Sequence, residues 1–170
     1  MTIPGIHLLR QTPAILRTLT EELSEEQARL RPVAERWSVL EVIGHLAHVE
    51  EPAFRNRVER MIGEDEPLLA SYEPGLHSAA GVYAARPLSE TLDAFSRQRD
   101  ASLEVLRSID ESALERTGRH EKLGRLTVNN LLHEWPLHDL GHVRQVAELV
   151  RAICFYPHIG PCRNAYQINP

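Results

Sequence analysis

Apolar residues recur at helical spacing, three to four positions apart, in four long segments of this sequence. These segments cover residues 6–23, 38–63, 89–109 and 127–153, and each carries aliphatic or aromatic side chains along one face. No segment alternates apolar and polar residues over the length of a β-strand. The hydrophobic pattern therefore predicts an all-α fold built on four long helices.

Capping signals mark the expected helix starts. Ser38 and Glu41 form a capping box at the start of the second long helix, and Thr127 is the expected N-cap of the fourth. A second capping box, Ser24 with Gln27, predicts a short turn between the first two long helices. Prolines inside three of the segments predict kinks, because proline removes a backbone hydrogen-bond donor: Pro13, Pro52 and Pro136.

The chain between the second and third long helices has no helical period. Residues 64–87 contain three prolines and two glycines, and a connection of this length in a compact domain is typically a crossover or a functional loop. Residues 153–170 are also rich in proline and glycine and predict an ordered coil extension. The expected architecture is a single domain over residues 1–170, an antiparallel four-helix bundle with a crossover between helices two and three.

Composition and charge then narrow the classes of function. The net charge of −5 offers no basic surface for nucleic acid or an anionic membrane. No apolar run approaches the roughly 20 residues of a membrane span, and the first residues lack the pattern of a signal peptide. Two cysteines are too few for a disulfide framework. We expect a cytoplasmic protein without nucleic-acid or membrane partners.

Histidine carries the candidate chemistry. His138 and His142 are four residues apart, so on a helix they project from one stripe and can bind one metal ion. His45 follows Val42 by three residues, among apolar neighbours, so its side chain is expected to point inward. A buried imidazole needs a partner, which is either a hydrogen bond or a metal ion shared with the other two histidines. The pattern favours the metal and leaves the hydrogen bond open.

Three imidazoles from two helices would leave coordination positions free for water or substrate, as in catalytic metal sites. Other catalytic signatures are absent from the sequence, including GxSxG, phosphate-binding loops, CxxC and the Glu-x-x-His pattern of di-iron bundles. The remaining histidines, among them His77 and His120, are expected to be exposed or in loops. The sequence therefore points to a single metal centre.

Several polar residues are candidates for a supporting role around such a centre. Glu41 and Glu134 each precede a candidate ligand by about one helical turn and could accept its second ring N–H, although either could equally be a solvated surface charge. His48 competes for the place of the first ligand. His133 lies on another helix face unless Pro136 bends the helix, so a supporting or structural role is expected.

Two motifs together resemble a known family. RWSVLEVIGHLAHVEE in the second helix and LHDLGHVRQVAEL in the fourth are similar to the corresponding helices of the DinB-like metalloprotein superfamily. The tail YPHIGPCRNAYQINP resembles the C-terminal extension of one branch of that superfamily. The resemblance covers nearly the whole chain.

This resemblance implies an up-down-down-up bundle, often a homodimer, with one divalent metal ion held by three histidines. Carried over to this chain, the ligands are His45, His138 and His142, and Gln145 occupies a commonly polar position after the last of them. His48 departs from the pattern, since relatives often have aspartate there. All-imidazole ligation suits several ions, and zinc, nickel, iron and manganese are the candidates.

The resemblance also implies an activity. Its known chemistries are thiol transfer and isomerisation with low-molecular-weight thiols, together with a broad class of metal-dependent hydrolases. The first hypothesis is therefore a metal-dependent hydrolase or thiol S-transferase acting on a small molecule that the sequence does not identify. The alternative is a non-catalytic dimeric stress-response or interaction module, with a structural metal or none.

Overall fold

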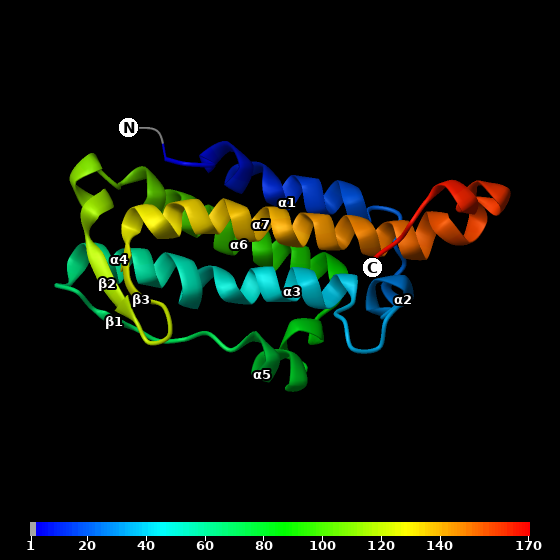
Figure 1. Cartoon of the computed structure of the whole chain (residues 1–170), viewed down its shortest axis with the longest axis horizontal. Coiled ribbons are helices and arrows are strands. Elements are labelled where there is room, and N and C mark those ends of the chain that lie inside the picture. Colours follow the sequence, from blue (N-terminus) through cyan, green and yellow to red (C-terminus); the bar gives the residue numbers. More distant parts are fainter. Residues whose placement is uncertain (1–2) are drawn as a thin grey trace.

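Four helical rods dominate the computed structural model, which describes residues 3–170 (Figure 1). A π-helical segment, Glu50–Arg55, joins two of the helices into one continuous rod. The helices of the four rods are α1 (Ile6–Thr20), α3 (Val39–Val49), α4 (Asn56–Gly63), α6 (Leu88–Arg107) and α7 (Val128–Val150). The expected all-α four-helix bundle is confirmed, with helix boundaries within a few residues of those predicted.

The rods run up, down, down and up in chain order. In Figure 1, α1 and α7 run from left to right, whereas α3–α4 and α6 run from right to left. Helix α3 packs on α6 and on α7, and α1 packs on α7 and on α6. The α3–α4 rod and α6 are parallel neighbours, so the chain between them must return along the length of the bundle. The crossover over residues 64–87 makes this return.

The capping boxes and prolines explain the local helix geometry. The side chains of Ser24, Ser38 and Thr127 each accept the predicted hydrogen bond at a helix start. Pro13 and Pro136 lie inside continuous helices, while Pro52 falls within the π-helical segment. A π-helical turn changes the hydrogen-bonding pattern locally, which accommodates a residue that has no N–H to donate.

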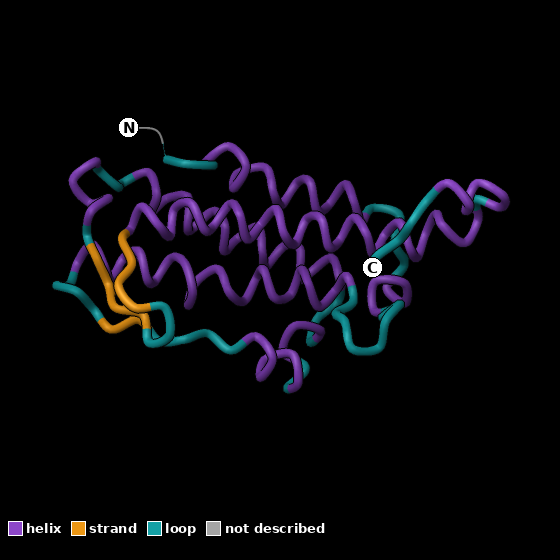
Figure 2. The backbone as a smooth tube through the Cα atoms, viewed as in Figure 1, coloured by secondary structure: helices purple, strands orange, loops and turns teal. Residues whose placement is uncertain are grey.

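A small β-sheet closes one end of the bundle and was not expected from the sequence (Figure 2). Its strands are β1 (Leu68–Leu69), β2 (Thr117–His120) and β3 (Gly124–Thr127). β1 pairs with β2 in parallel and β2 pairs with β3 antiparallel. Strands of two to four residues are too short to show the alternating period that identifies a strand.

Short helices occupy the connections and the tail. Helix α2 (Glu25–Arg29) follows the first capping box, and α5 (Pro74–Ala79) lies in the crossover. The tail was expected as coil, and this is wrong for most of it, because a π-helical segment continues α7 and two 3-10 helices follow. The two 3-10 helices are Tyr156–His158 and Gly160–Ala165.

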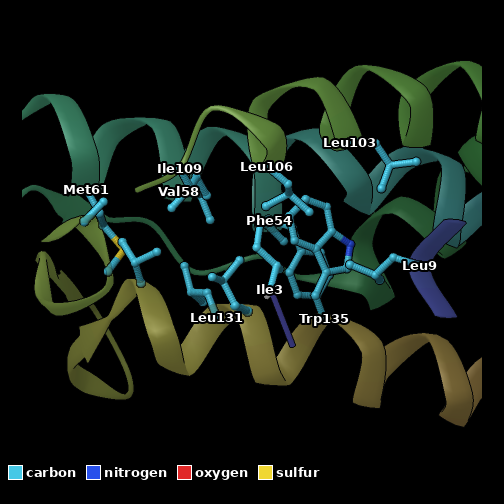
Figure 3. Packing of buried hydrophobic residues seen from close by; sticks show 14 of the residues in the cluster. Ile3, Leu9, Phe54, Val58, Met61, Leu103, Leu106, Ile109, Leu131 and Trp135 are labelled. Carbon is cyan, nitrogen blue, oxygen red and sulfur yellow. The ribbon is translucent and has the colours of Figure 1, made fainter. Parts of the chain in front are cut away.

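Two apolar clusters form the core. The first fills the end of the bundle near the sheet, where the Phe54 ring stacks on Trp135 at 4.9 Å between ring centroids (Figure 3). The second, which includes Leu16, Ile43 and Val146, fills the end near α2. No helix of the described chain is long and apolar enough to cross a membrane.

Polar residues lie on the helices between these two clusters. On α7, the buried apolar residues from Val128 to Trp135 belong to the first cluster and those from Val146 to Val150 to the second, so His138 and His142 fall between them. On α3, His45 lies next to Leu46 of the second cluster. His45, His138 and His142 therefore form a polar layer between the two apolar clusters of the core.

Candidate metal centre

Three histidine side chains converge in this polar layer. The Nε2 atom of His138 lies 3.2 Å from Nε2 of His45 and 3.2 Å from Nε2 of His142. One ring nitrogen from each residue falls within 4.8 Å of the other two. In residues 3–170 this is the one group of three or more histidine, cysteine or acidic side chains close enough to hold a metal ion.

The donor set suits a transition-metal ion. With metal–nitrogen bonds of about 2.0–2.1 Å, two imidazole nitrogens on one tetrahedral ion lie roughly 3.3 Å apart, close to the two observed separations. Burial lowers the pKa of His45 to about 2, and repulsion from His142 and His138 adds to this effect. Burial likewise lowers the pKa of His138 to about 4 and lowers that of His142. All three rings are therefore neutral near pH 7, with lone pairs available to a cation.

A hydrogen bond at Nδ1, the ring nitrogen that faces away from the cluster, fixes the tautomer of His142. The Gln145 side-chain oxygen lies 3.0 Å from Nδ1 of His142 and can only accept, so Nδ1 carries the proton and Nε2 is left bare. Gln145 thus supports the ring in the way expected of a residue around a metal ligand. Nδ1 of His138 is buried and has no hydrogen-bond partner.

A chain of two tyrosines connects His45 to His48. Nδ1 of His45 lies 3.3 Å from the Tyr83 hydroxyl, which lies 2.8 Å from the Tyr72 hydroxyl, which lies 2.8 Å from Nδ1 of His48. When Nε2 of His45 binds an ion, its Nδ1–H can donate to Tyr83, Tyr83 to Tyr72, and Tyr72 to His48. His48 is therefore the end of this chain and lies outside the three-histidine cluster.

Gly44 sets the position of Tyr83 against His45. A Cβ atom on Gly44 would lie 2.0 Å from the Tyr83 carbonyl oxygen, so the backbones of α3 and the crossover touch there. Only glycine permits this approach. Gly44 therefore allows the Tyr83 hydroxyl to approach His45.

Replacing Gly44 by alanine is expected to destabilise the protein by about 1–3 kcal/mol, because the new methyl group must push the crossover away from α3. Gly141→Ala is the matched control, since a Cβ on Gly141 of α7 meets nothing within 4 Å. Alanine there should be neutral or stabilising by up to about 1 kcal/mol. Urea unfolding followed by circular dichroism measures both, and equal effects of the two substitutions would contradict the close-approach explanation.

The structure separates the other predicted supporting residues from the cluster. Glu41 does not contact His45, because its carboxylate pairs with Arg31 (Nε to Oε2, 2.8 Å) and accepts from the backbone N–H of Ser38. Although burial opposes ionisation, these bonds hold the pKa of Glu41 below its usual value. His133 is exposed and bonds to the carbonyl oxygen of its own helix turn. Both side chains therefore make their hydrogen bonds away from the three histidines.

Glu134 has a different position from the one expected. It is exposed and makes no hydrogen bond to His138, yet it lines the same cavity as the three histidines. Two histidines expected to be exposed or in loops are also placed otherwise. His120 is buried and lines the cavity, and His77 stacks on Tyr72 with ring centroids 4.9 Å apart.

A buried ionic network lies directly behind His138. Arg99 donates to both carboxylate oxygens of Asp139 (2.6 and 2.9 Å), to both of Glu50 (2.6 and 3.1 Å) and to the Leu9 carbonyl oxygen (2.7 Å). Burial lowers the pKa of Arg99, but the two carboxylates outweigh it and raise the pKa above its usual value. Two carboxylates against one guanidinium leave a net negative charge beside the candidate cation site.

The histidines open into a cavity of about 410 Å³, a size typical of small-molecule sites. Aromatic side chains surround the imidazoles there. The Trp37 ring lies 4.9 Å from that of His45 and stacks on His142 at 6.3 Å, and the Phe54 ring lies 5.2 Å from that of His138. The cluster is thus reached from one side through a partly apolar pocket.

A four-helix bundle with a crossover between parallel rods and a three-histidine cluster in its core defines a class of helical protein with a candidate metal site. Residues 8–146 match the family model of the DinB superfamily, and the chain belongs to this superfamily. The matched residues include all three clustered histidines and end before the C-terminal tail.

Individual relatives agree with this assignment. The chain is 22% identical over 146 residues to a protein of Oceanobacillus iheyensis named "Putative metal-dependent hydrolase", an alignment that covers 86% of this chain and 84% of that protein. The structure of this chain is similar to that of YfiT from Bacillus subtilis, with a TM-score of 0.79 and 22% sequence identity. The match covers 86% of this chain and 84% of the YfiT chain. YfiT is described as a probable metal-dependent hydrolase with an unusual four-helix bundle topology. At this identity the likeness to YfiT establishes the fold.

Proposed function

We propose that this protein binds one divalent metal ion through His45, His138 and His142 and is a metal-dependent enzyme acting on a small molecule. The nucleophile is water in a hydrolase or a small thiol in an S-transferase. One observation carries the proposal, namely that three neutral imidazoles converge through their Nε2 atoms at the wall of a cavity. The name of the Oceanobacillus iheyensis relative supports the hydrolase assignment.

A divalent ion with three imidazole ligands supplies a Lewis acid that lowers the pKa of a water or thiol in its remaining coordination position. The chain's own residues keep the ligands ready for it. Gln145 holds the proton of His142 on Nδ1, and the Tyr83 hydroxyl can accept from Nδ1–H of His45, so that both Nε2 atoms are free to bind the ion. The net negative charge of the network formed by Glu50, Arg99 and Asp139 favours a cation there.

The cavity residues supply the remaining parts of a reaction site. Trp37 and Phe54 cover the imidazoles and limit the water around them. Glu134 lines the cavity one turn before His138 on the same helix face, where its carboxylate can accept a proton from a nucleophile and return it to a leaving group. His120 adds a second titratable group at the same wall.

The test is a screen of tag-free protein that has been stripped with a chelator and reloaded with zinc, nickel, iron(II) or manganese. Ester, amide and phosphoester substrates test the hydrolase, and electrophiles offered with a low-molecular-weight thiol test the transferase. We expect turnover that disappears on stripping, returns with one metal, and falls at least about 100-fold in His142→Ala. His133→Ala is the matched control on the same helix and should keep full activity.

The two alternatives predict different results in this screen. Turnover that survives both stripping and His142→Ala would contradict the proposal. Stoichiometric metal binding without turnover on any substrate class would favour a non-catalytic module with a structural metal.

A further inference from the structure

Arg57 is a buried cation at the wall of the candidate active-site cavity. It lies on α4, its side chain is only 7% exposed, and it lines the cavity together with the three histidines. Phe54, three residues earlier on the same rod, contacts the ring of His138. The guanidinium donates to the carbonyl oxygen of Ala70, which follows β1, so it lies at the sheet side of the cavity.

Arg57 has few partners for a buried charge. Its hydrogen bond within residues 3–170 runs from Nη2 to the Ala70 carbonyl oxygen (2.8 Å), and Nε is buried with no partner at all. No ion pair within residues 3–170 includes Arg57. Arg99, the other deeply buried arginine, donates to two carboxylates and a carbonyl oxygen. In contrast to Arg99, Arg57 has no carboxylate partner among the described residues.

A purely structural role explains this arrangement poorly. Burying a guanidinium without a counter-charge is costly, and one hydrogen bond to a loop carbonyl oxygen could be made by a neutral side chain. Burial lowers the pKa of Arg57, and the charge of Glu134 only partly opposes this effect. Arginine is favoured where a planar carboxylate or phosphate must be bound through two parallel N–H groups.

The other charged groups around the cavity do not replace such an anion. Lys122 lines the cavity but pairs with Glu73, and both are exposed. Nδ1 of His120 accepts from the backbone N–H groups of Lys122 and Leu123, so this ring is held in place by the strand turn. Glu134 is the carboxylate whose charge raises the pKa of Arg57, and it makes no ion pair with Arg57 among the described residues.

We propose that Arg57 binds an anionic group, a carboxylate or a phosphate, on the small-molecule substrate of this cavity. The substrate's reacting bond then lies at the histidines, a part of the inference that rests on the proposed function. Anion binding at Arg57 itself does not depend on a metal ion. The substrate class is therefore a small molecule with an anionic group that is separate from its reactive bond.

Metal-free protein tests the inference directly, because it removes any anion binding at the histidines. Inorganic phosphate or sodium acetate is titrated at constant ionic strength while the arginine Nε–H signals are followed in ¹H–¹⁵N NMR spectra. We expect one Nε–H signal, assigned to Arg57 by its loss in Arg57→Gln, to shift saturably with at least one of the two anions. The anion that saturates it at the lower concentration identifies the group as carboxylate or phosphate.

Two substitutions give the matched comparison. Arg57→Gln should weaken binding at least about tenfold, whereas Arg60→Gln, three residues later at a partly exposed arginine that pairs with Glu64, should leave it unchanged. Glu134→Gln leaves Arg57 intact and should tighten binding, because it removes the opposing charge. This variant keeps the inference testable if Arg57→Gln fails to fold.

Failure of the inference can be told apart from failure of the proposed function. Absence of a saturable shift with either anion, or equal binding by wild type and Arg57→Gln, would overturn the anion site and leave the metal centre untouched. Loss of metal binding with intact anion binding would overturn the metal centre and leave the anion site untouched.

Discussion

Substituting His138 by alanine is expected to reduce the bound metal from about one equivalent to less than about a tenth of an equivalent after dialysis. His138 should have the largest effect of the three histidines, because its Nε2 lies 3.2 Å from Nε2 of both others. Two remaining imidazoles give a much weaker site. Elemental analysis of protein purified without a metal-affinity tag measures the loss.

The control and a second readout make this result specific. His133→Ala removes an exposed histidine from the same helix and should keep the full equivalent of metal. An ion bound only by the folded state raises its apparent stability, so chelation should lower the melting temperature of wild type but not that of His138→Ala. Equal metal content in His138→Ala and His133→Ala would show that the metal is held elsewhere.

Replacing Arg99 by methionine is expected to cost about 3–5 kcal/mol of folding free energy. Arg99 lies on α6 and bonds to the other three rods, through Leu9 of α1, Glu50 between α3 and α4, and Asp139 of α7. Its loss leaves two carboxylates buried without a counter-charge. Urea unfolding at pH 7 measures the change.

Two further variants separate the lost ion pair from lost packing. Arg97→Met alters an exposed arginine on the same helix and should lie within about 0.5 kcal/mol of wild type. Adding Glu50→Gln and Asp139→Asn to Arg99→Met removes the stranded charges, so this triple variant should be more stable than Arg99→Met alone. A triple variant no more stable than the single one would show that packing of Arg99, rather than its charge, carries the effect.

The helical part of the fold could be predicted because each long helix repeats its signal many times. The apolar stripe is read over several turns, and the caps at Ser38 and Thr127 mark the starts independently. The sheet could not be predicted in this way. β1 has two residues, and its pairing with β2 depends on a contact between segments about fifty positions apart.

The candidate ligands were also readable from the sequence, because an i, i+4 pair and an inward-facing position have geometric consequences on any helix. Of the residues that support them, Gln145 was expected after His142, but the two tyrosines of the crossover were not. Tyr72 and Tyr83 lie in the crossover, whose path the local sequence does not specify, although Gly44 shows that it passes close to α3. Arg99 carries no local signal at all, because its partners lie on three other segments.

Glu41 shows why a spacing argument can fail. It lies one turn before His45, as a residue around a metal ligand would, but it is also the third residue of a helix with a Ser38 cap. The backbone N–H groups of the first turn need acceptors, and the capping box and Arg31 use the carboxylate first. The homodimer implied by the family resemblance and the cytoplasmic location expected from the composition stay predictions.

X-ray absorption spectroscopy of the metal-loaded protein tests the central claim most directly, since it reports the ligands of the bound ion. We predict a first shell of nitrogen and oxygen atoms at about 2.0–2.1 Å with the multiple-scattering pattern of three imidazoles, and a loss of that pattern in His138→Ala. A shell containing sulfur, or one made only of oxygen atoms, would mean that the three histidines of the core do not hold the metal.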